Sequence, residues 1–193
     1  MYLKYIKSEK DIDNSGGAGG DDVNHRMNGR EIFFKTSFNL LSDNEIWEQK
    51  FELSLSDHGN NILNEFDKVH PDDRSSSIYN GRTVKIGWQN SFYSGRNTSV
   101  IGIDKEIEMA DSYYNSISKS GSFTSEEPYS KTSVTGLYLQ NRIKIDKDIN
   151  IVTGLRKDHH EDYGSKTVYK ISTSCRLKNK YRVKGSYGTG FKI

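Results

Sequence analysis

Four aspartates near the start of the chain are its best candidate for ligand chemistry. Asp11, Asp13, Asp21 and Asp22 flank the glycine-rich stretch Gly16–Gly20. Calcium takes about six to eight oxygen ligands, and short carboxylates on a flexible backbone can fold around one ion. Asp and Gly are also frequent turn formers, so a solvated hairpin loop is the simpler alternative. We therefore predict a calcium loop at these four aspartates, without an EF-hand spacing and with no other cofactor required.

Other acidic and histidine residues form weaker patterns. His159 and His160 precede Glu161 and Asp162. Adjacent strand residues point to opposite faces, so the two histidines are a poor metal pair. We expect a solvated loop there, with a contact to substrate or to another domain as the alternative. A second group, with a polar loop as its default interpretation, comprises His58, Asp67, His70, Asp72 and Asp73.

No arrangement of catalytic type is present. Ser, His and Asp all occur, but neither a G-x-S-x-G elbow nor a metal-hydrolase helix motif does. The glycine-rich run Gly185–Gly190 lies at a strand end and no helix follows it, which disfavours a phosphate loop. Positive and negative charges are mixed along the chain, so no nucleic-acid-binding patch is indicated. The sequence predicts no catalytic residues and no enzyme.

The elements that carry these residues are amphipathic β-strands. In Ile46–Ser56, for example, Trp47, Phe51 and Leu53 alternate with Glu48, Lys50, Glu52 and Ser54. This period of two is typical of strands, whereas a helix needs apolar residues three and four apart. We predict an opening stub and eight full strands: Tyr2–Lys7, Arg30–Leu40, Ile46–Ser56, Gly81–Phe92, Thr98–Met109, Lys131–Ile145, Asn150–Asp158, Lys166–Leu177 and Tyr181–Gly190.

Long and short connections alternate between these strands. The long ones are Ser8–Gly29, Asp57–Tyr79, Ala110–Ser130 and His159–Ser165. The short ones are Leu41–Glu45, Tyr93–Arg96, Asp146–Asp148 and Lys178–Lys180. Outer-membrane barrels place short turns on the periplasmic side and long loops outside. The fold class we predict is therefore all-β, an antiparallel transmembrane β-barrel segment in contact with outer-membrane lipid.

Composition agrees with a barrel wall. The 193 residues are 33% hydrophobic and 28% charged, with a net charge of +2. These proportions are poor for a large soluble core but suit a wall that needs apolar residues only at alternate positions. No apolar run reaches the roughly 18 residues of a transmembrane helix. The single cysteine, Cys175, cannot form an internal disulfide and is interpreted as a small wall residue.

The faces of the strands do not by themselves decide between a membrane barrel and a soluble β-sandwich. Aromatic residues near strand ends favour the barrel, because aromatic girdles mark the membrane interfaces. They are Phe92, Tyr93, Tyr138, Tyr169 and Tyr181. The charged face suits a wide lumen better than a closed eight-stranded barrel. We expect lumen water or another domain to contact its charges: Lys35, Glu48, Lys50, Glu52, Asp104, Arg142, Lys144 and Arg156.

Two C-terminal segments add a family resemblance. Residues 154–164 read GLRKDHHEDYG, and residues 186–192 read SYGTGFK. They resemble a G-x-R-x-D-x-H-x-x-F/Y-G strand and loop, followed one hairpin later by S-Y-G-T-G-F-K, of TonB-dependent outer-membrane receptors. The Asp- and Gly-rich segment 11–22 resembles an external loop of the vitamin B12 receptor-like branch.

The resemblance implies a barrel of about 22 strands that surrounds a plug domain and imports a scarce, bulky nutrient. A corrinoid such as cobalamin, or a siderophore, is the implied ligand, and TonB supplies the energy by pulling on the plug. Residues 1–193 are then expected to be a partial receptor β-barrel domain without a plug, a central and truncated slice. Met1–Tyr5 lacks signal-peptide features, so we expect the natural start upstream. A small passive porin and a soluble β-sandwich binding module remain alternatives.

Overall fold

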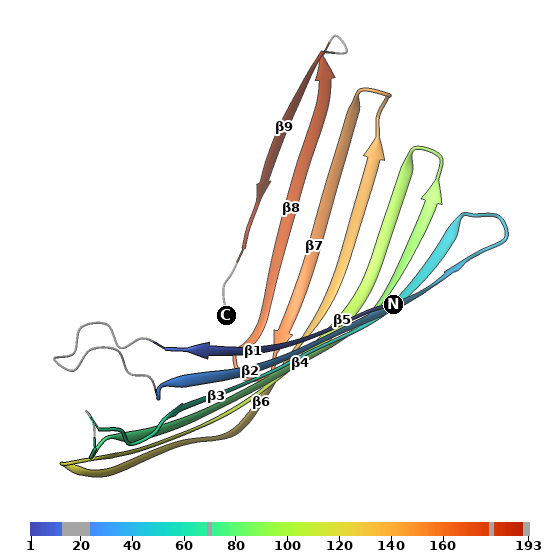
Figure 1. Ribbon diagram of the computed structural model, residues 1–193. Helices are drawn as coiled ribbons and strands as arrows, with labels where there is room; N and C mark the ends of the chain where they lie inside the picture. The colour runs from blue at the N-terminus through green and yellow to red at the C-terminus, as the bar shows by residue number, and fades with distance from the viewer. Residues whose placement is uncertain (13–23, 69–70, 178–179, 191–193) are drawn as a thin grey trace. The chain divides into compact units, whose positions relative to one another are not determined.

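All regular structure in the computed structural model is β-strand. The structure describes residues 1–12, 24–68, 71–177 and 180–190. No helix among them is long and apolar enough to cross a membrane. The nine strands are β1 (Tyr2–Asp11), β2 (Arg26–Leu41), β3 (Trp47–Asn64), β4 (Arg74–Ser94), β5 (Asn97–Ser118), β6 (Gly121–Lys144), β7 (Ile149–His160), β8 (Gly164–Leu177) and β9 (Tyr181–Gly188). They form one sheet in chain order, with β1 and β9 at its two ends (Figure 1). The predicted all-β antiparallel class is confirmed.

Each predicted segment is a strand, and the opening stub is a full one. β1 has 10 residues and pairs with β2 from Tyr2 opposite Lys35 to Asp11 opposite Arg26. This ladder extends beyond the predicted end of the stub at Lys7, into residues that carry polar side chains on both faces. Apolar alternation therefore stops before the strand does.

The predicted long loops Asp57–Tyr79 and Ala110–Ser130 are wrong. β3 continues to Asn64 and β4 begins at Arg74, while β5 and β6 are separated by residues 119–120 alone. Residues 121–131 of β6 are exposed throughout, so no apolar pattern marks them as a strand. The backbone ladder persists there because it pairs N–H with C=O groups whatever the side chains are. Likewise, Ser8–Gly29 shortens to residues 12–25 and His159–Ser165 to residues 161–163.

Three predicted short turns, Leu41–Glu45, Tyr93–Arg96 and Asp146–Asp148, are confirmed, and side chains hold two of them in place. The fourth, Lys178–Lys180, falls mostly on residues that the structure does not describe. In the turn between β6 and β7, Asp146 Oδ1 accepts hydrogen bonds from the backbone N–H groups of Asp148 at 2.7 Å and Ile149 at 2.8 Å. In the turn between β2 and β3, Ser42 Oγ accepts the Trp47 N–H at 3.1 Å. Gly95 makes the two-residue turn between β4 and β5 with a φ of 55°, which glycine adopts at little cost. These local bonds set the register of each hairpin.

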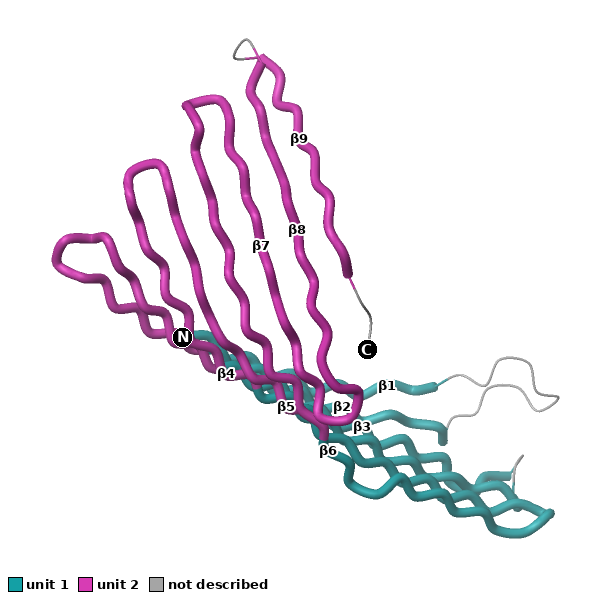
Figure 2. The backbone as a smooth tube through the Cα atoms, turned by 180° about the vertical axis from the view of Figure 1, so that it is seen from behind, with its two compact units in different colours: residues 1–35, 54–84, 108–131 teal, residues 36–53, 85–107, 132–193 magenta. Residues whose placement is uncertain are grey.

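The chain divides into two compact units (Figure 2). Unit 1 comprises residues 1–35, 54–84 and 108–131, and unit 2 comprises residues 36–53, 85–107 and 132–193. In unit 2, β6 pairs with β7 so that Leu139 lies opposite Leu155 and Tyr138 lies opposite Arg156. Because successive residues alternate between faces, this register gives β6 and β7 one apolar and one polar face.

β8 and β9 extend both faces of unit 2. The apolar face includes Leu137, Leu139, Ile143, Ile151, Leu155, Tyr169, Ile171, Cys175 and Val183. The polar face includes Tyr138, Gln140, Arg142, Asn150, Arg156, Lys170, Ser172, Ser174, Lys184 and Ser186. Cys175 thus lies on a wall strand, as predicted, opposite Ile149 and Val183.

The described residues contain no buried hydrophobic core. Leu139 and Leu155 are each 50% exposed, and the buried side chains are polar, among them Asp57, Asp158 and His160. A soluble sandwich would cover its apolar face with a second sheet. No second layer covers the apolar face within the described part of the chain, which is the arrangement of a wall that contacts lipid.

We predict that a cation on the apolar face destabilises the fold far more than the same cation one residue away. Leu139→Arg places a charge in lipid and should lower the free energy of unfolding by about 2–4 kcal/mol. Gln140→Arg, on the polar face, is the matched control and should change it by less than about 1 kcal/mol. Urea unfolding of the chain reconstituted in lipid vesicles measures both, and equal losses would contradict the two-faced wall.

Candidate functional site: the charged face of unit 2

Arg156 is the centre of the polar face of unit 2. Its Nη1 and Nη2 atoms donate to the two carboxylate oxygens of Asp104 on β5, each at 2.8 Å. Its Nε donates to Asp158 Oδ1 at 2.8 Å, and Nη2 lies 2.7 Å from the same oxygen. The guanidinium therefore bridges two strands and two carboxylates, the bidentate geometry in which arginine pairs most strongly.

The carboxylates of this site are well covered. The side chains of Asp104 and Asp158 are 13% and 10% exposed, and that of Arg156 is 33% exposed. Tyr138 lies under the guanidinium, whose Cζ is 5.7 Å from the ring centroid. The tyrosine hydroxyl donates to Gln89 Oε1 at 3.2 Å, which joins β6 to β4.

Further ion pairs surround this centre. Lys85 Nζ lies 2.9 Å from Glu106 Oε2, and Lys50 Nζ lies 3.0 Å from Glu52 Oε2. With Arg156, three cations thus face four carboxylates on the polar face of unit 2. The predicted inward charges Lys50, Glu52, Asp104 and Arg156 pair with neighbours on their own face. Whether they also contact a plug or lumen water stays a prediction.

Two glycines on neighbouring strands make room for the large side chains of the site. A Cβ atom at Gly102 would overlap the Tyr138 ring. One at Gly136 would overlap the Arg156 guanidinium and lie 2.6 Å from Asp158 Oδ1. The side chains of Tyr138 and Arg156 therefore lie over glycine backbone. The sequence pattern does not mark these positions, because glycine in a strand can equally indicate a bulge or a tight bend.

The resemblance motif along β7 builds this site on a single face. Arg156, Asp158 and His160 are two residues apart and share one side of the strand. His160 is 6% exposed, and its Nδ1 accepts the backbone N–H of Asp162 at 3.1 Å. Its ring lies 4.6 Å from that of Tyr163. The motif histidine therefore fixes the turn that follows β7.

His159 and His160 point to opposite faces, as predicted, but the predicted solvated loop is wrong for them, because both lie at the end of β7 and His160 is buried. His159 is exposed and its Nδ1 lies 3.0 Å from Ser165 Oγ, whereas Nε2 of the buried His160 lies 3.4 Å from Thr132 Oγ1. Within the described residues no group of three or more His, Cys, Asp or Glu side chains could hold a metal ion.

Of the second predicted group, Asp67, Asp72 and Asp73 lie in the connection between β3 and β4, as predicted, whereas His58 does not. His58 lies on β3 and its ring occupies the space above Gly81. Asp72 forms an ion pair with Lys119 at 3.3 Å. His70 lies outside the described residues.

The predicted calcium loop is described at one residue only. Asp11, the last residue of β1, forms an ion pair with Arg26 on β2 at 3.5 Å. Asp13, Asp21 and Asp22 lie outside the described residues. Calcium binding at the four aspartates therefore stays a prediction.

Two predicted interfacial aromatic residues, Tyr138 and Tyr169, lie within strands rather than at their ends. Tyr138 lies within β6, on the polar face and in contact with Arg156, rather than at a strand end. Phe92 and Tyr93 do lie at the end of β4, and they are 45% and 38% exposed. The error arises because an isolated tyrosine suits a membrane interface and a cation–π contact equally well.

Antiparallel strands with an uncovered apolar face and a charged opposite face define a wall of the transmembrane β-barrel class. The comparison with family models agrees: residues 3–193 match the β-barrel of TonB dependent receptor-like proteins. The chain belongs to this family, whose members are bacterial outer-membrane receptors and transporters.

Solved structures support the same fold. The ferric citrate transporter FecA, in its unliganded form, is 15% identical and aligns with a TM-score of 0.66 over 96% of this chain and 32% of its own. The RagAB peptide transporter is 12% identical and aligns with a TM-score of 0.63 over 85% of this chain and 22% of its own. The chain thus spans between about a fifth and a third of the length of these structures, and the likeness shows the fold alone.

We predict that removing the Arg156 guanidinium destabilises the sheet. Arg156→Ala leaves two covered carboxylates, Asp104 and Asp158, without their shared partner. The expected loss is about 1–3 kcal/mol in the free energy of unfolding, since the arginine itself is partly exposed. Arg142→Ala, an exposed arginine on the same face, is the matched control and should cost less than about 0.5 kcal/mol. Chemical denaturation in micelles compares them, and equal stability of the two variants would contradict the bridging role of Arg156.

Proposed function

We propose that this chain forms part of the wall of an outer-membrane importer for a scarce, bulky nutrient. The ligand is a corrinoid or a siderophore-like compound, and the Asp- and Gly-rich segment 11–22 supports the vitamin B12 receptor-like branch. TonB energises import by acting on a plug domain in the lumen. The observation that carries the proposal is the Arg156–Asp104–Asp158 network on the polar face of a chain that belongs to the TonB-dependent receptor β-barrel family.

The polar face of unit 2 suits contact with a plug. Arg156 pairs with Asp104 and Asp158 along the wall, so these three side chains are held in fixed positions. A shallow hollow beside them is lined by Asp104, Tyr138, Arg156 and Lys170. A plug can dock on such a surface through polar contacts at a modest desolvation cost, since the carboxylates keep their partner.

The intact wall is proposed to contain more strands than these nine. β1 and β9 lie at the ends of the strand order, and each leaves one row of backbone N–H and C=O groups to be paired. In hydrocarbon each unpaired group costs several kcal/mol, and a closed barrel removes both edges. Pairing of β1 and β9 with further strands therefore fits the partial coverage of FecA and RagAB.

Energy-dependent uptake tests the proposal against a passive porin. Disruption of the gene in the bacterium that makes the protein should abolish uptake of radiolabelled cobalamin or of a ferric siderophore, and a plasmid copy should restore it. A protonophore should abolish the restored uptake, because TonB needs an energised inner membrane. Restored uptake that survives the protonophore would favour the porin, and unchanged uptake of every nutrient on disruption would contradict import.

A calcium ion ordering the external loop is the second part of the proposal. A variant with Asp11, Asp13, Asp21 and Asp22 changed to Asn keeps the chain length but removes the carboxylates that a hard cation prefers. Terbium luminescence of the chain in micelles should report at least a tenfold loss of affinity. The control changes Asp43→Asn and Glu45→Gln in the turn between β2 and β3, and equal losses in both variants would contradict a specific site.

A further inference from the structure

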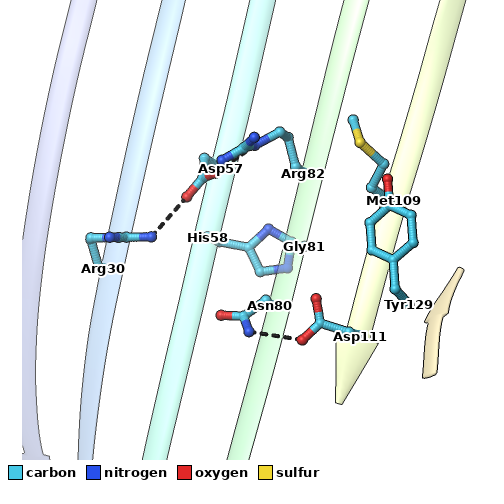
Figure 3. Close-up of a pocket in the computed structure, with 9 residues that line it drawn as sticks. All are labelled: Arg30, Asp57, His58, Asn80, Gly81, Arg82, Met109, Asp111 and Tyr129. Atoms are coloured by element: carbon cyan, nitrogen blue, oxygen red, sulfur yellow. Dashed lines mark hydrogen bonds and ion pairs between the residues drawn. The ribbon is translucent and has the colours of Figure 1, made fainter. Parts of the chain in front are cut away.

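A triad of charged side chains joins three strands of unit 1. Asp57 on β3 lies between Arg30 on β2 and Arg82 on β4 (Figure 3). Arg30 Nη2 donates to Asp57 Oδ1 at 3.1 Å, and Arg82 donates from Nε to Oδ2 at 2.7 Å. Arg82 Nη2 lies 2.6 Å from the same oxygen. One carboxylate thus orients two guanidinium groups from different strands.

The triad presents its cations, and not its carboxylate, to the surroundings. The side chain of Asp57 is 11% exposed, whereas those of Arg30 and Arg82 are 56% and 54% exposed. A guanidinium has five N–H donors, and Asp57 engages one from Arg30 and two from Arg82. Most of the donors therefore remain directed away from Asp57.

A third cation extends the triad along the sheet. Lys7 on β1 lies directly opposite Arg30 in the β1–β2 ladder, so the two side chains share one face. Arg30, Asp57 and Arg82 line a pocket in unit 1. The second carboxylate that lines this pocket, Asp111, accepts a hydrogen bond from Asn80 Nδ2 at 2.9 Å. We call Lys7, Arg30 and Arg82 the basic row; Asp57 pairs with the two arginines, and Lys7 adjoins Arg30 in the ladder.

The basic row borders an apolar surface of unit 1. Residues two positions apart on a strand share a face. Each charged residue here has an apolar residue two positions away on its own strand. The neighbours of Lys7, Arg30, Asp57 and Arg82 are, in that order, Tyr5, Ile32, Leu55 and Val84. The ladder also pairs Tyr5 with Ile32 and Leu3 with Phe34. On four strands, therefore, the same face changes from apolar to charged at one level.

We propose that the basic row binds the phosphate of a lipid headgroup. In a barrel of this family the apolar face contacts lipid, so the level where it becomes charged is that of the headgroups. Unit 1 carries the connections 12–25, 65–73 and 119–120, of which the first two are longer than any connection of unit 2. In such barrels the longer connections belong to the outer side. Arginine forks match phosphate oxygens in a bidentate manner. The three cations of the row outnumber Asp57, the one carboxylate that orients its two arginines.

Asp57 is a positioning residue in this site. Without it the two guanidiniums would repel each other and adopt many rotamers, so their donors would no longer converge on one anion. Arg30→Lys with Arg82→Lys keeps the charge but removes the fork. Asp57→Asn and the double lysine variant are each expected to weaken phosphate binding less than removal of the two arginines does.

Lipid retention in micelles tests the proposal, with phosphatidic acid as probe and diacylglycerol as its phosphate-free control. Native mass spectrometry of the folded chain should show phosphatidic acid bound at least tenfold more tightly than diacylglycerol. The Arg30→Gln/Asp57→Asn/Arg82→Gln variant leaves no unpaired carboxylate and should lose this preference. Asp57→Asn and the double lysine variant should each lose it in part, and circular dichroism verifies that every variant keeps its β-structure.

The control removes the same number of cations elsewhere, by Arg142→Gln and Lys170→Gln on the polar face of unit 2, and should retain the preference. Competition with inorganic phosphate separates the two sources of the anion. If it displaces phosphatidic acid at equal concentration, the site binds free phosphate and the lipid proposal fails. Equal retention of both lipids, or loss of preference in the polar-face control, also overturns it. Nutrient uptake is not the readout, so failure here leaves the proposed import untouched.

Discussion

Every backbone N–H and C=O group that meets hydrocarbon must be paired within the protein, and this constraint determines the rest of the structure. Antiparallel ladders meet it, as between β7 and β8, where pairing runs unbroken from Ile149 opposite Cys175 to His160 opposite Gly164. A ladder forces side chains to alternate. An apolar face and a polar face then follow from the choice of residues alone.

The polar face shows what the alternation makes possible. Once one side of each strand is committed to lipid, the other can hold charges at fixed spacing across neighbouring strands. Arg156 uses this spacing to bind Asp104 and Asp158, and Gly102 and Gly136 leave the space that the large side chains need. In unit 1, a second charged cluster lies on the same side of the strands as Ile32, Leu55 and Val84. There Asp57 pairs with both Arg30 and Arg82. In both places a covered aspartate positions an arginine that is partly exposed.

The strands could be predicted where side chains alternate in polarity. Trp47, Phe51 and Leu53 identify β3, but its end at Asn64 could not be predicted because the apolar alternation is interrupted at residues 57–61, which carry no apolar side chain on either face. Pairings between distant strands could not be predicted either, since nothing in the sequence assigns Arg156 to Asp104, 52 residues away. The motif at residues 154–164 marks β7 as a family signature. That its Arg156 lies opposite Tyr138 is known only from the register of the ladder. The polar pattern assigns Asp57 to a loop, so its contacts with two arginines are found only in the structure.

The two-faced wall can be tested most directly at the only cysteine of the chain. Cys175 lies on the apolar face of β8 and Ser174 on the polar face. An environment-sensitive fluorophore on Cys175, or on Ser174→Cys in a Cys175→Ser background, is measured in lipid vesicles with two quenchers. We predict quenching by nitroxide-labelled lipid at position 175 and by aqueous iodide at position 174. The same quencher acting equally on both positions would contradict a wall with one lipid face and one polar face.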